Sequence, residues 1–338
     1  MLRFSMKLTH LVTLTALFSA GLMAAEAANP VSYDERYYQT NTITSAVDDA
    51  DNGYTFLVVG DWGRNGHFAQ RSVAKWMDIA SYQFDADMII STGDNFYSNG
   101  VASVNDPYWQ TSYEAIYQGP HLFIDWYVVL GNHDYRGNWQ AQIDYSKVSR
   151  RWNMPAQYFD KLIPLEDGGS LHLVFLDTNP LNPDYQHEEK YAETQRQDSQ
   201  AQLAWFEKTL KRNENADWTI VIGHHPLYSS GKRYGKTAAV RGIIEPLLEK
   251  YQVDAYIAGH EHDLQHNQPQ GRSVEHFVSG GGSEIRPVAQ REFTAFAKSS
   301  AGFAVVRVNQ QHTTLEFIDD HGDVIYQYQL NKAGSNAQ

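Results

Sequence analysis

Five short apolar runs in this sequence end at a glycine, and each glycine is followed at once by a side chain that can bind a metal ion. Carboxylate, amide and imidazole groups suit first-row transition metals, and the chain has no cysteine that could add a thiolate. One Gly-Asp pair after a strand is a common turn, but five such endings in one chain are hard to explain as turns. The endings are Gly60-Asp61, Gly93-Asp94, Gly131-Asn132, Gly223-His224 and Gly259-His260-Glu261-His262.

The apolar runs before these glycines have the composition of strands buried on both faces. They are short, rich in β-branched residues and without polar alternation, as in parallel strands that helices cover. Ligands in such sheets bind at the carboxyl ends of the strands, so the residues after the glycines should meet there. The predicted strands are 56–59, 88–90, 127–130, 171–176, 219–222 and 255–257, and helical patterns cover His67–Ile79, Gln195–Lys211 and Ala238–Lys250.

The last part of the chain has a different pattern. Residues 303–308, 313–318 and 324–330 alternate more between apolar and polar side chains, and short polar turns such as His321-Gly322-Asp323 join them. This pattern predicts an antiparallel set of strands. Together with the earlier strands and helices, it predicts an α/β fold in which two sheets pack together under helices.

The N-terminus reads as a secretory signal peptide over residues 1–27. Arg3 and Lys7 precede a mostly apolar stretch, 11–20, and Ala25-Glu26-Ala27 has the small residues of a cleavage site. The apolar stretch is shorter than the roughly 20 residues that a membrane-spanning helix needs. We therefore expect an exported protein, periplasmic or secreted, with no membrane association after cleavage.

The remaining chain is predicted to hold one catalytic domain, 53–331, after an N-terminal surface extension, 28–52, and before a short tail, 332–338. Composition is that of a globular chain, with 42% hydrophobic residues. The formal net charge of −13 argues against nucleic acid as a partner. We expect a monomer whose partner is a small molecule or a peptide.

The five blocks resemble those of the calcineurin-like metallophosphoesterase superfamily. Tyr97, three residues after Asp94, narrows the resemblance to the purple acid phosphatases, and further blocks are similar to the tartrate-resistant type. These blocks are 151–155, 176–178, 202–205 and 279–282. The resemblance covers about residues 54–330 and implies a four-layer αββα sandwich of two mixed sheets flanked by helices.

The resemblance also implies a dinuclear metal centre. Asp61, Tyr97 and His262 would hold Fe3+, and Asp94 would bridge to a second, divalent metal, for which Fe2+, Zn2+ and Mn2+ stay open. The ligands of that second metal would be Asn132, His224 and His260. The chemistry of the donors agrees, because a phenol with a pKa of about 10 becomes a ligand at mild pH only beside a strongly Lewis-acidic ion.

The function implied by the resemblance is that of an acid phosphatase, which hydrolyses phosphate monoesters with a metal-bound hydroxide as the nucleophile. His133 would donate a proton or hydrogen bond to the phosphoryl group or the leaving group. The family's second histidine is absent from the loop 227–234, so the general acid stays open, with Lys232 or Arg233 as cationic substitutes. Alternatives are a phosphodiesterase or nucleotidase of the same superfamily, or a non-catalytic binding protein that kept the fold.

Several neighbours of the predicted ligands receive supporting roles. We expect His225 and Asp134 to lie behind the ligands rather than to bind metal, and His67 and Arg64 are candidates for the rim of the cleft. The polar stretch 179–198 predicts an exposed loop near the cleft. The natural substrate and the pH optimum stay open.

Overall fold

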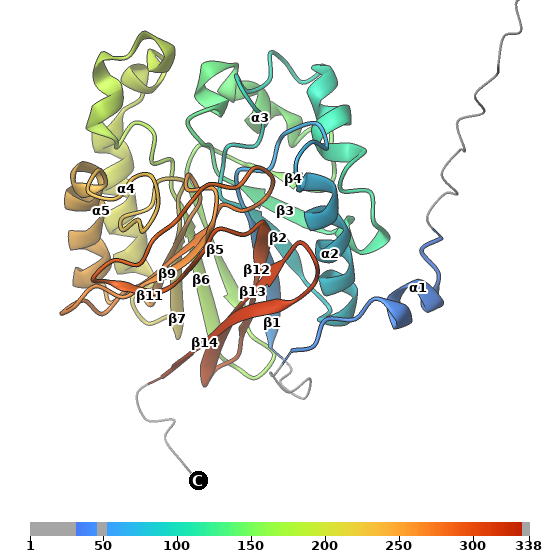
Figure 1. The fold of residues 1–338 in the computed structure, drawn as a ribbon. Helices are drawn as coiled ribbons and strands as arrows, with labels where there is room; N and C mark the ends of the chain where they lie inside the picture. The colour runs from blue at the N-terminus through green and yellow to red at the C-terminus, as the bar shows by residue number, and fades with distance from the viewer. Residues whose placement is uncertain (1–31, 46–52, 333–338) are drawn as a thin grey trace, which may run out of the picture. The chain divides into compact units, whose positions relative to one another are not determined.

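Two seven-stranded mixed sheets form the centre of the molecule. The computed structural model describes residues 32–45 and 53–332. The first sheet has the strand order β14-β13-β12-β1-β2-β3-β4, and the second has the order β11-β9-β10-β8-β7-β6-β5. Figure 1 shows the helices on the outer sides of this pair of sheets, which is the predicted four-layer αββα sandwich.

The first sheet combines the early parallel strands with the C-terminal antiparallel ones. β1 pairs with β2 in parallel and with β12 in an antiparallel register, so the two sets that the sequence separates lie in one sheet. Pairing to the distant end of the chain is not visible in local pattern. The strands are β1 Tyr54–Val59, β2 Met88–Ser91, β3 Asp125–Val128, β4 Trp152–Asn153, β12 Gly302–Val308, β13 His312–Asp319 and β14 Val324–Asn331.

The second sheet has a parallel core and antiparallel edges. β6, β7, β8 and β10 run parallel, while β5, β9 and β11 add at the sides in antiparallel pairs. The sequence analysis missed the three added strands and β10. The strands are β5 Phe159–Pro164, β6 Ser170–Phe175, β7 Trp218–Ile222, β8 Ala255–Ala258, β9 Leu264–Asn267, β10 Glu275–Ser279 and β11 Thr294–Lys298.

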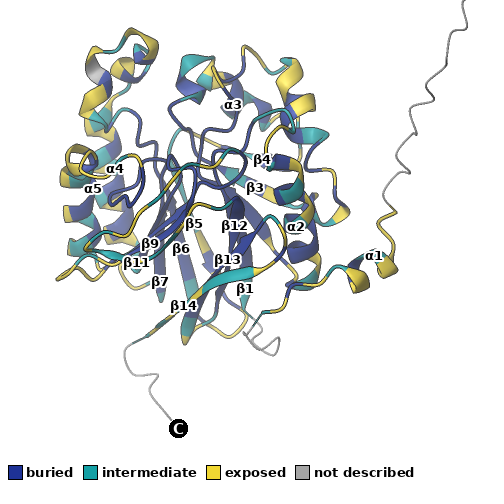
Figure 2. Ribbon diagram, viewed as in Figure 1, coloured by how far each residue is buried: buried dark blue, intermediate teal, exposed yellow. Residues whose placement is uncertain are grey.

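Three apolar layers hold the sandwich together. The middle layer lies between the sheets and includes Phe56, Ile220 and Phe317, all fully buried. Figure 2 shows the central strands buried and the outer helix faces exposed, while the edge strands β5, β11 and β14 are partly exposed. The helices are α1 Glu35–Thr40, α2 Gln70–Gln83, α3 Trp139–Tyr145, α4 Ser199–Arg212 and α5 Ala238–Lys250, with a π-helical turn Trp109–Glu114 and 3-10 turns Pro120–Leu122, Asp134–Arg136, Pro183–His187, Glu189–Tyr191 and Thr194–Arg196.

The three predicted helices are present, but two of them begin later than the sequence pattern suggested. α2 begins at Gln70 because Phe68 has a φ of +55°, which a right-handed helix excludes. α4 begins at Ser199 because the Asp198 side chain accepts a hydrogen bond from Ala201 N and so caps the helix. The sequence pattern predicted these helices from His67 and Gln195, and so included residues that lie before both observed starts.

The described part of the predicted surface extension is packed against the domain. Tyr38 and Ile43 are buried, and Tyr38 Oη donates to Asp78 Oδ2 at 2.9 Å on α2. Gln83 fixes the backbone of Ile43 with two hydrogen bonds. Residues 33–45 therefore belong to the same compact unit as the sandwich, whereas the predicted signal peptide and the last six residues lie outside the described residues. Among the described helices none is long and apolar enough to cross a membrane.

Candidate metal centre

The seven predicted ligands converge where the carboxyl ends of both sheets meet. Asp61, Asp94 and Asn132 follow β1, β2 and β3 of the first sheet, with Tyr97 in the loop after Asp94. From the second sheet, His224 follows β7, and His260 and His262 follow β8. All seven side chains are buried.

The backbone at this edge takes conformations that direct the side chains inward. Asp61, Asp94 and His260 all have left-handed φ values, of 59°, 53° and 69°. Non-glycine residues adopt this region at a cost of order 1–3 kcal/mol each, and such strain clusters at functional sites. Gly131 allows the loops after β2 and β3 to approach closely, because a Cβ there would lie 2.1 Å from Asp94 N.

One half of the cluster gathers around the phenol of Tyr97. Its Oη lies 2.8 Å from Asp61 Oδ1, 2.9 Å from Asp94 Oδ2 and 3.1 Å from His262 Nε2. Asp61 also accepts a hydrogen bond from His260 N at its other oxygen, which holds the carboxylate in place. Four potential ligands thus point at one another from three loops.

The other half gathers around the imidazole of His224. Its Nε2 lies 3.2 Å from Asn132 Oδ1, 3.1 Å from His260 Nδ1 and 3.5 Å from Asp94 Oδ1. The carboxylate of Asp94 thus has one oxygen beside Tyr97 and the other beside His224. This is the arrangement that a carboxylate bridging two metals requires.

The composition of the cluster fits two cations. Burial, followed by the charges of Asp61 and Asp94, raises the pKa of the Tyr97 phenol well above its usual value. Two buried carboxylates against one phenol are stable only beside positive charge. His224 can complete a metal site with Asp61 and Asp94 by the separation of their ligand atoms. The donors, with oxygen and imidazole ligands and no thiolate, suit first-row metals.

Hydrogen bonds behind the ligands fix which ring nitrogens face the cluster. His224 Nδ1 lies 2.9 Å from the carbonyl of Thr92 and therefore carries the proton, which leaves Nε2 as the free lone pair. His262 turns Nε2 toward Tyr97, while its Nδ1 lies 3.9 Å from Glu284 and makes no hydrogen bond. Of these two rings, that of His224 is the one held by such a bond.

Asp134 lies behind the cluster, as expected from the sequence. Its carboxylate accepts hydrogen bonds from the backbone N–H groups of Asn95, Phe96 and Gly131, and so ties together the loops after β2 and β3. Burial and the nearby Asp94 carboxylate raise the pKa of Asp134 to about 7, while these donors act in the opposite direction. The residue positions ligand loops and does not face the cluster.

His225 also lies behind the ligands. It is close enough to His224 and His260 for the three to form a metal-binding group by distance. Both of its ring nitrogens, however, are already engaged, Nδ1 with Thr178 Oγ1 at 2.7 Å and Nε2 with Tyr185 Oη at 2.7 Å. A histidine with two such partners has no free lone pair for a metal.

His133 reaches the open side of the cluster. Its backbone N–H donates to Asp94 Oδ1 at 2.7 Å, and its Nε2 lies 3.9 Å from Asp94 Oδ2. The ring Nδ1 lies 2.6 Å from the carbonyl of Ser98, so Nδ1 carries a proton and Nε2 is the nitrogen available to a ligand. With 18% of its side chain exposed, His133 can contact a molecule that enters from solvent.

The two rim candidates differ. The Arg64 guanidinium lies 3.7 Å from the centre of the Tyr97 ring and forms an ion pair of 2.6 Å with Glu284. It therefore stacks on a predicted ligand, where its charge favours a phenolate. His67 is exposed, and its backbone N–H bonds to Arg64 O. The structure gives it no contact with the seven ligands.

The stretch 179–198, predicted to form an exposed loop near the cleft, is exposed over part of its length and buried at several residues. It forms the 3-10 turns Pro183–His187, Glu189–Tyr191 and Thr194–Arg196, and Tyr185 and Tyr191 are buried. Tyr191 Oη accepts hydrogen bonds from Asn132 Nδ2 at 2.9 Å and from Arg136 Nη2 at 2.8 Å. By binding the amide nitrogen of Asn132, Tyr191 turns the amide oxygen toward His224.

Sequence reasoning missed Tyr191 because nothing in a polar loop sets one tyrosine apart.

The loop of Lys232 and Arg233 contacts the cluster through one of its two cations. Sequence reasoning treated Arg233 only as a possible cation, yet Arg233 Nε lies 2.8 Å from His260 Nε2. The buried Glu261 side chain accepts from the backbone of Lys232 and Arg233 and fixes this loop, while the Lys232 side chain is exposed. Of the two predicted cations, Arg233 alone contacts a predicted ligand.

Comparison with known proteins gives a consistent result. The family model for calcineurin-like phosphoesterases matches residues 54–264. The chain is 32% identical over 298 residues to purple acid phosphatase 7 of Arabidopsis thaliana, covering 85% of this chain and 89% of that protein. It is also 32% identical over 312 residues to human tartrate-resistant acid phosphatase type 5, covering 86% and 95%.

A solved structure of a protein with another role is similar in fold. GAP50, described as the anchor in the inner membrane complex of Plasmodium, superimposes with a TM-score of 0.72 at 25% identity, covering 83% of this chain and 89% of that one. Similarity of fold alone therefore does not separate catalysis from anchoring.

Replacing Tyr191 by phenylalanine tests its hold on Asn132. The change removes the acceptor for Asn132 Nδ2, so the amide can rotate and metal affinity should fall by about 10–100-fold, as for other groups that orient ligands. Metal retained after dialysis against graded chelator measures the effect, with Tyr234→Phe, an exposed tyrosine, as the control. Equal metal retention in the Tyr191→Phe protein and the control would contradict the role.

Proposed function

This chain belongs to the calcineurin-like phosphoesterase family as a purple acid phosphatase that hydrolyses phosphate monoesters, and we propose that the seven-residue cluster is its catalytic centre. The observation that carries the assignment is Asp94, whose two oxygens face Tyr97 and His224 separately. A carboxylate in that position joins two metal sites into one dinuclear centre. The fold and the relatives' names agree with hydrolysis of phosphate esters.

The proposed ligands divide by the hardness of their donors. Asp61, Tyr97 and His262 would hold Fe3+, which is the ion that stabilises a buried phenolate. The amide of Asn132 and the imidazoles of His224 and His260 would hold a divalent ion, Fe2+, Zn2+ or Mn2+. When bound, the two cations supply positive charge for phosphoryl oxygens and acidify water at neutral pH.

The chain's own residues orient the substrate and handle protons. His133 points Nε2 toward the open side of the cluster, where it would donate to a phosphoryl oxygen or to the leaving group. Burial, partly opposed by Asp94, lowers the pKa of His133, and the Arg136 charge acts in the same direction as burial. Because Nδ1 already carries a proton, Nε2 donates only from the doubly protonated ring, and the lowered pKa confines that role to acidic pH.

Arg233 is proposed to stabilise charge on the leaving group in place of the histidine that the family carries in this loop. Its contact with His260 sets the guanidinium at the edge of the cluster. Lys232, the residue directly before Arg233 on the same fixed loop, is exposed and makes no such contact. This difference assigns the role to one of the two cations that the sequence left open.

Two other functions can be compared with the geometry of the same seven-residue cluster. A phosphodiesterase or nucleotidase of the superfamily would use a similar centre, but Tyr97 among the donors favours the purple acid phosphatase type. A non-catalytic protein, such as the similarity to an anchor protein suggests, would have no need to keep all seven ligand side chains buried and convergent. Phosphatase assays on metal-replete protein separate these functions.

Export is also a proposal, because it rests on the sequence of residues 1–27 alone. We place the catalytic domain at 53–331 after cleavage near Ala27, and the mass of the protein recovered from an exporting host tests this boundary. Catalysis outside the cytoplasm agrees with a centre that needs no thiolate, since the chain contains no cysteine.

Replacing Asp94 by alanine should abolish both metal binding and hydrolysis. The loss of the bridging carboxylate removes several kcal/mol of transition-state stabilisation, so kcat/KM should fall by about a thousandfold or more. Elemental analysis and hydrolysis of 4-nitrophenyl phosphate measure the two effects, with Asp144→Ala, an exposed carboxylate, as the control. Full activity in the Asp94→Ala protein would refute the assignment of the centre.

The metal-replete protein should be violet, because tyrosinate bound to Fe3+ absorbs visible light. Tyr97→Phe should remove the visible band while circular dichroism shows a folded chain. The exposed Tyr234→Phe variant should keep the colour. A visible band that survives in Tyr97→Phe would show that another group supplies the colour.

Arg233→Ala should slow substrates with poor leaving groups more than substrates with good ones. Turnover of an alkyl phosphate should fall about tenfold relative to 4-nitrophenyl phosphate, as expected for the loss of one charge-assisted contact. Lys232→Ala serves as the matched control and should change this ratio by less than about twofold. Identical ratios in the two variants would rule out a special role for Arg233.

A further inference from the structure

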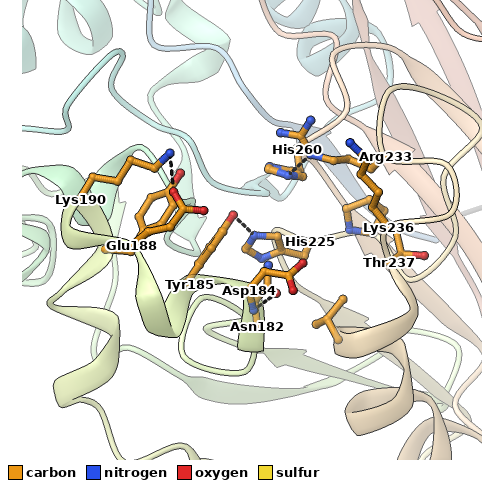
Figure 3. A pocket seen from close by; sticks show the side chains of 13 residues that line it. Asn182, Asp184, Tyr185, Glu188, Lys190, His225, Arg233, Lys236, Thr237 and His260 are labelled. Carbon is orange, nitrogen blue, oxygen red and sulfur yellow. Dashed lines mark hydrogen bonds and ion pairs between the residues drawn. The ribbon is translucent and has the colours of Figure 1, made fainter.

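A cavity of about 230 Å³ opens beside the second half of the cluster. Its walls come from the turns of residues 182–191 on one side and from residues 233–240 on the other, and His260 and His225 form its inner end. Figure 3 shows Tyr185 directed across this space to His225, with Arg233 and Lys236 on the facing side. The cavity therefore adjoins the place where a leaving group would emerge.

Two cations on one wall lack an acidic partner. Among the residues that the structure describes, no carboxylate lies within 4.0 Å of the charged groups of Arg233 or Lys236. The third cation of the lining, Lys190, is already paired with Glu188 at 2.6 Å. In a chain with a net charge of −13, two unpaired cations in one cavity are available to an anionic ligand.

The opposite wall offers acceptors and hydroxyl-binding groups. Asp184 and Asn182 line the cavity there, and the Asn182 side chain accepts from Asp184 N, which fixes the turn. Carboxylate and amide oxygens of this kind suit hydroxyl groups of a ligand. A ligand that satisfies both walls therefore has an anionic group and one or more hydroxyls.

The size of the cavity limits the ligand further. Pockets for drug-sized ligands enclose about 300–1,000 Å³, so this space suits a smaller organic group. Small hydroxylated acids fit the volume and the charges together.

We propose that this cavity binds the alcohol part of the substrate and favours small phosphomonoesters whose alcohol part carries a second anionic group, held by Lys236 and Arg233. The inference rests on the proposed function, because it places the scissile phosphate at the seven-residue cluster. The inference adds a substrate class that the cluster itself does not specify, since the cluster would contact only the phosphoryl group. Lys236 is the selectivity residue, as it contacts none of the predicted metal ligands.

The test compares two substrates that differ in one group. 3-Phosphoglycerate and glycerol 3-phosphate both release phosphate from a primary alcohol, but the first has a carboxylate where the second has a hydroxymethyl group. The metal-replete wild-type protein should prefer 3-phosphoglycerate by about tenfold in kcat/KM, as one charge-assisted contact in a partly enclosed site allows. Lys236→Glu should bring that ratio to one or below.

Lys232→Glu is the matched control, because it makes the same charge change four residues earlier, on a side chain that is exposed like that of Lys236 but does not line the cavity. It should leave the ratio within about twofold of wild type, since its charge does not face the space that the substrate would occupy. Equal shifts in the two variants, or no preference in the wild-type protein, would overturn the inference. Metal content of each variant shows that the centre is intact.

Hydrolysis of 4-nitrophenyl phosphate distinguishes failure of the proposed substrate class from failure of the proposed function. If the wild-type protein cleaves this substrate but does not distinguish the two glycerol derivatives, the cavity does not select anions and the proposed function stands. If the metal-replete protein cleaves none of the three, the proposed function fails, and the substrate class fails with it.

Discussion

The site depends on negative charge that is buried in one place. Asp61 and Asp94 lie within 3 Å of the same phenol, with Tyr97 between them and no water-exposed surface to disperse their charge. Such a cluster is unfavourable without compensation, and Arg64 above the ring supplies one full positive charge. Two bound cations would resolve this imbalance and would link metal binding to the stability of the strand ends.

The sandwich suits this arrangement because two sheets place their carboxyl ends together. The first sheet delivers mainly oxygen donors, and the second delivers three imidazoles, so the two halves of the centre draw on both sheets. Asp94 lies where the halves meet, and Asp134 ties its loop to the next through backbone hydrogen bonds. The left-handed backbone at Asp61, Asp94 and His260 is tolerated because the surrounding layers are packed without exposure.

Residues in the loops around the centre distinguish this protein from the pattern of its family. Arg233 stands in a loop that lacks the family's histidine, and it contacts His260 directly. The turns that contain Tyr185 and Tyr191 close over the other side, where one tyrosine holds His225 and the other holds Asn132. Substrate selection therefore depends on two loops that are far apart in the sequence, while the metal ligands depend on strand ends.

The sequence by itself determined most of the strands and predicted which side chains would meet at their ends, because a glycine after a buried apolar run is typical of a strand end. Those residue types predicted a metal site and two sheets packed under helices, and the family resemblance, narrowed by Tyr97 three residues after Asp94, implied the four-layer sandwich and the dinuclear centre. Only the tertiary structure decided that β12 pairs with β1, that Phe68 and Asp198 delay two helices, and that Tyr191 orients Asn132. The pairing of β12 with β1 and the contact of Tyr191 with Asn132 join segments distant in the chain, for which local pattern carries no signal. The helix starts are set locally, by the backbone of Phe68 and the cap of Asp198, and hydrophobic periodicity does not register either of them.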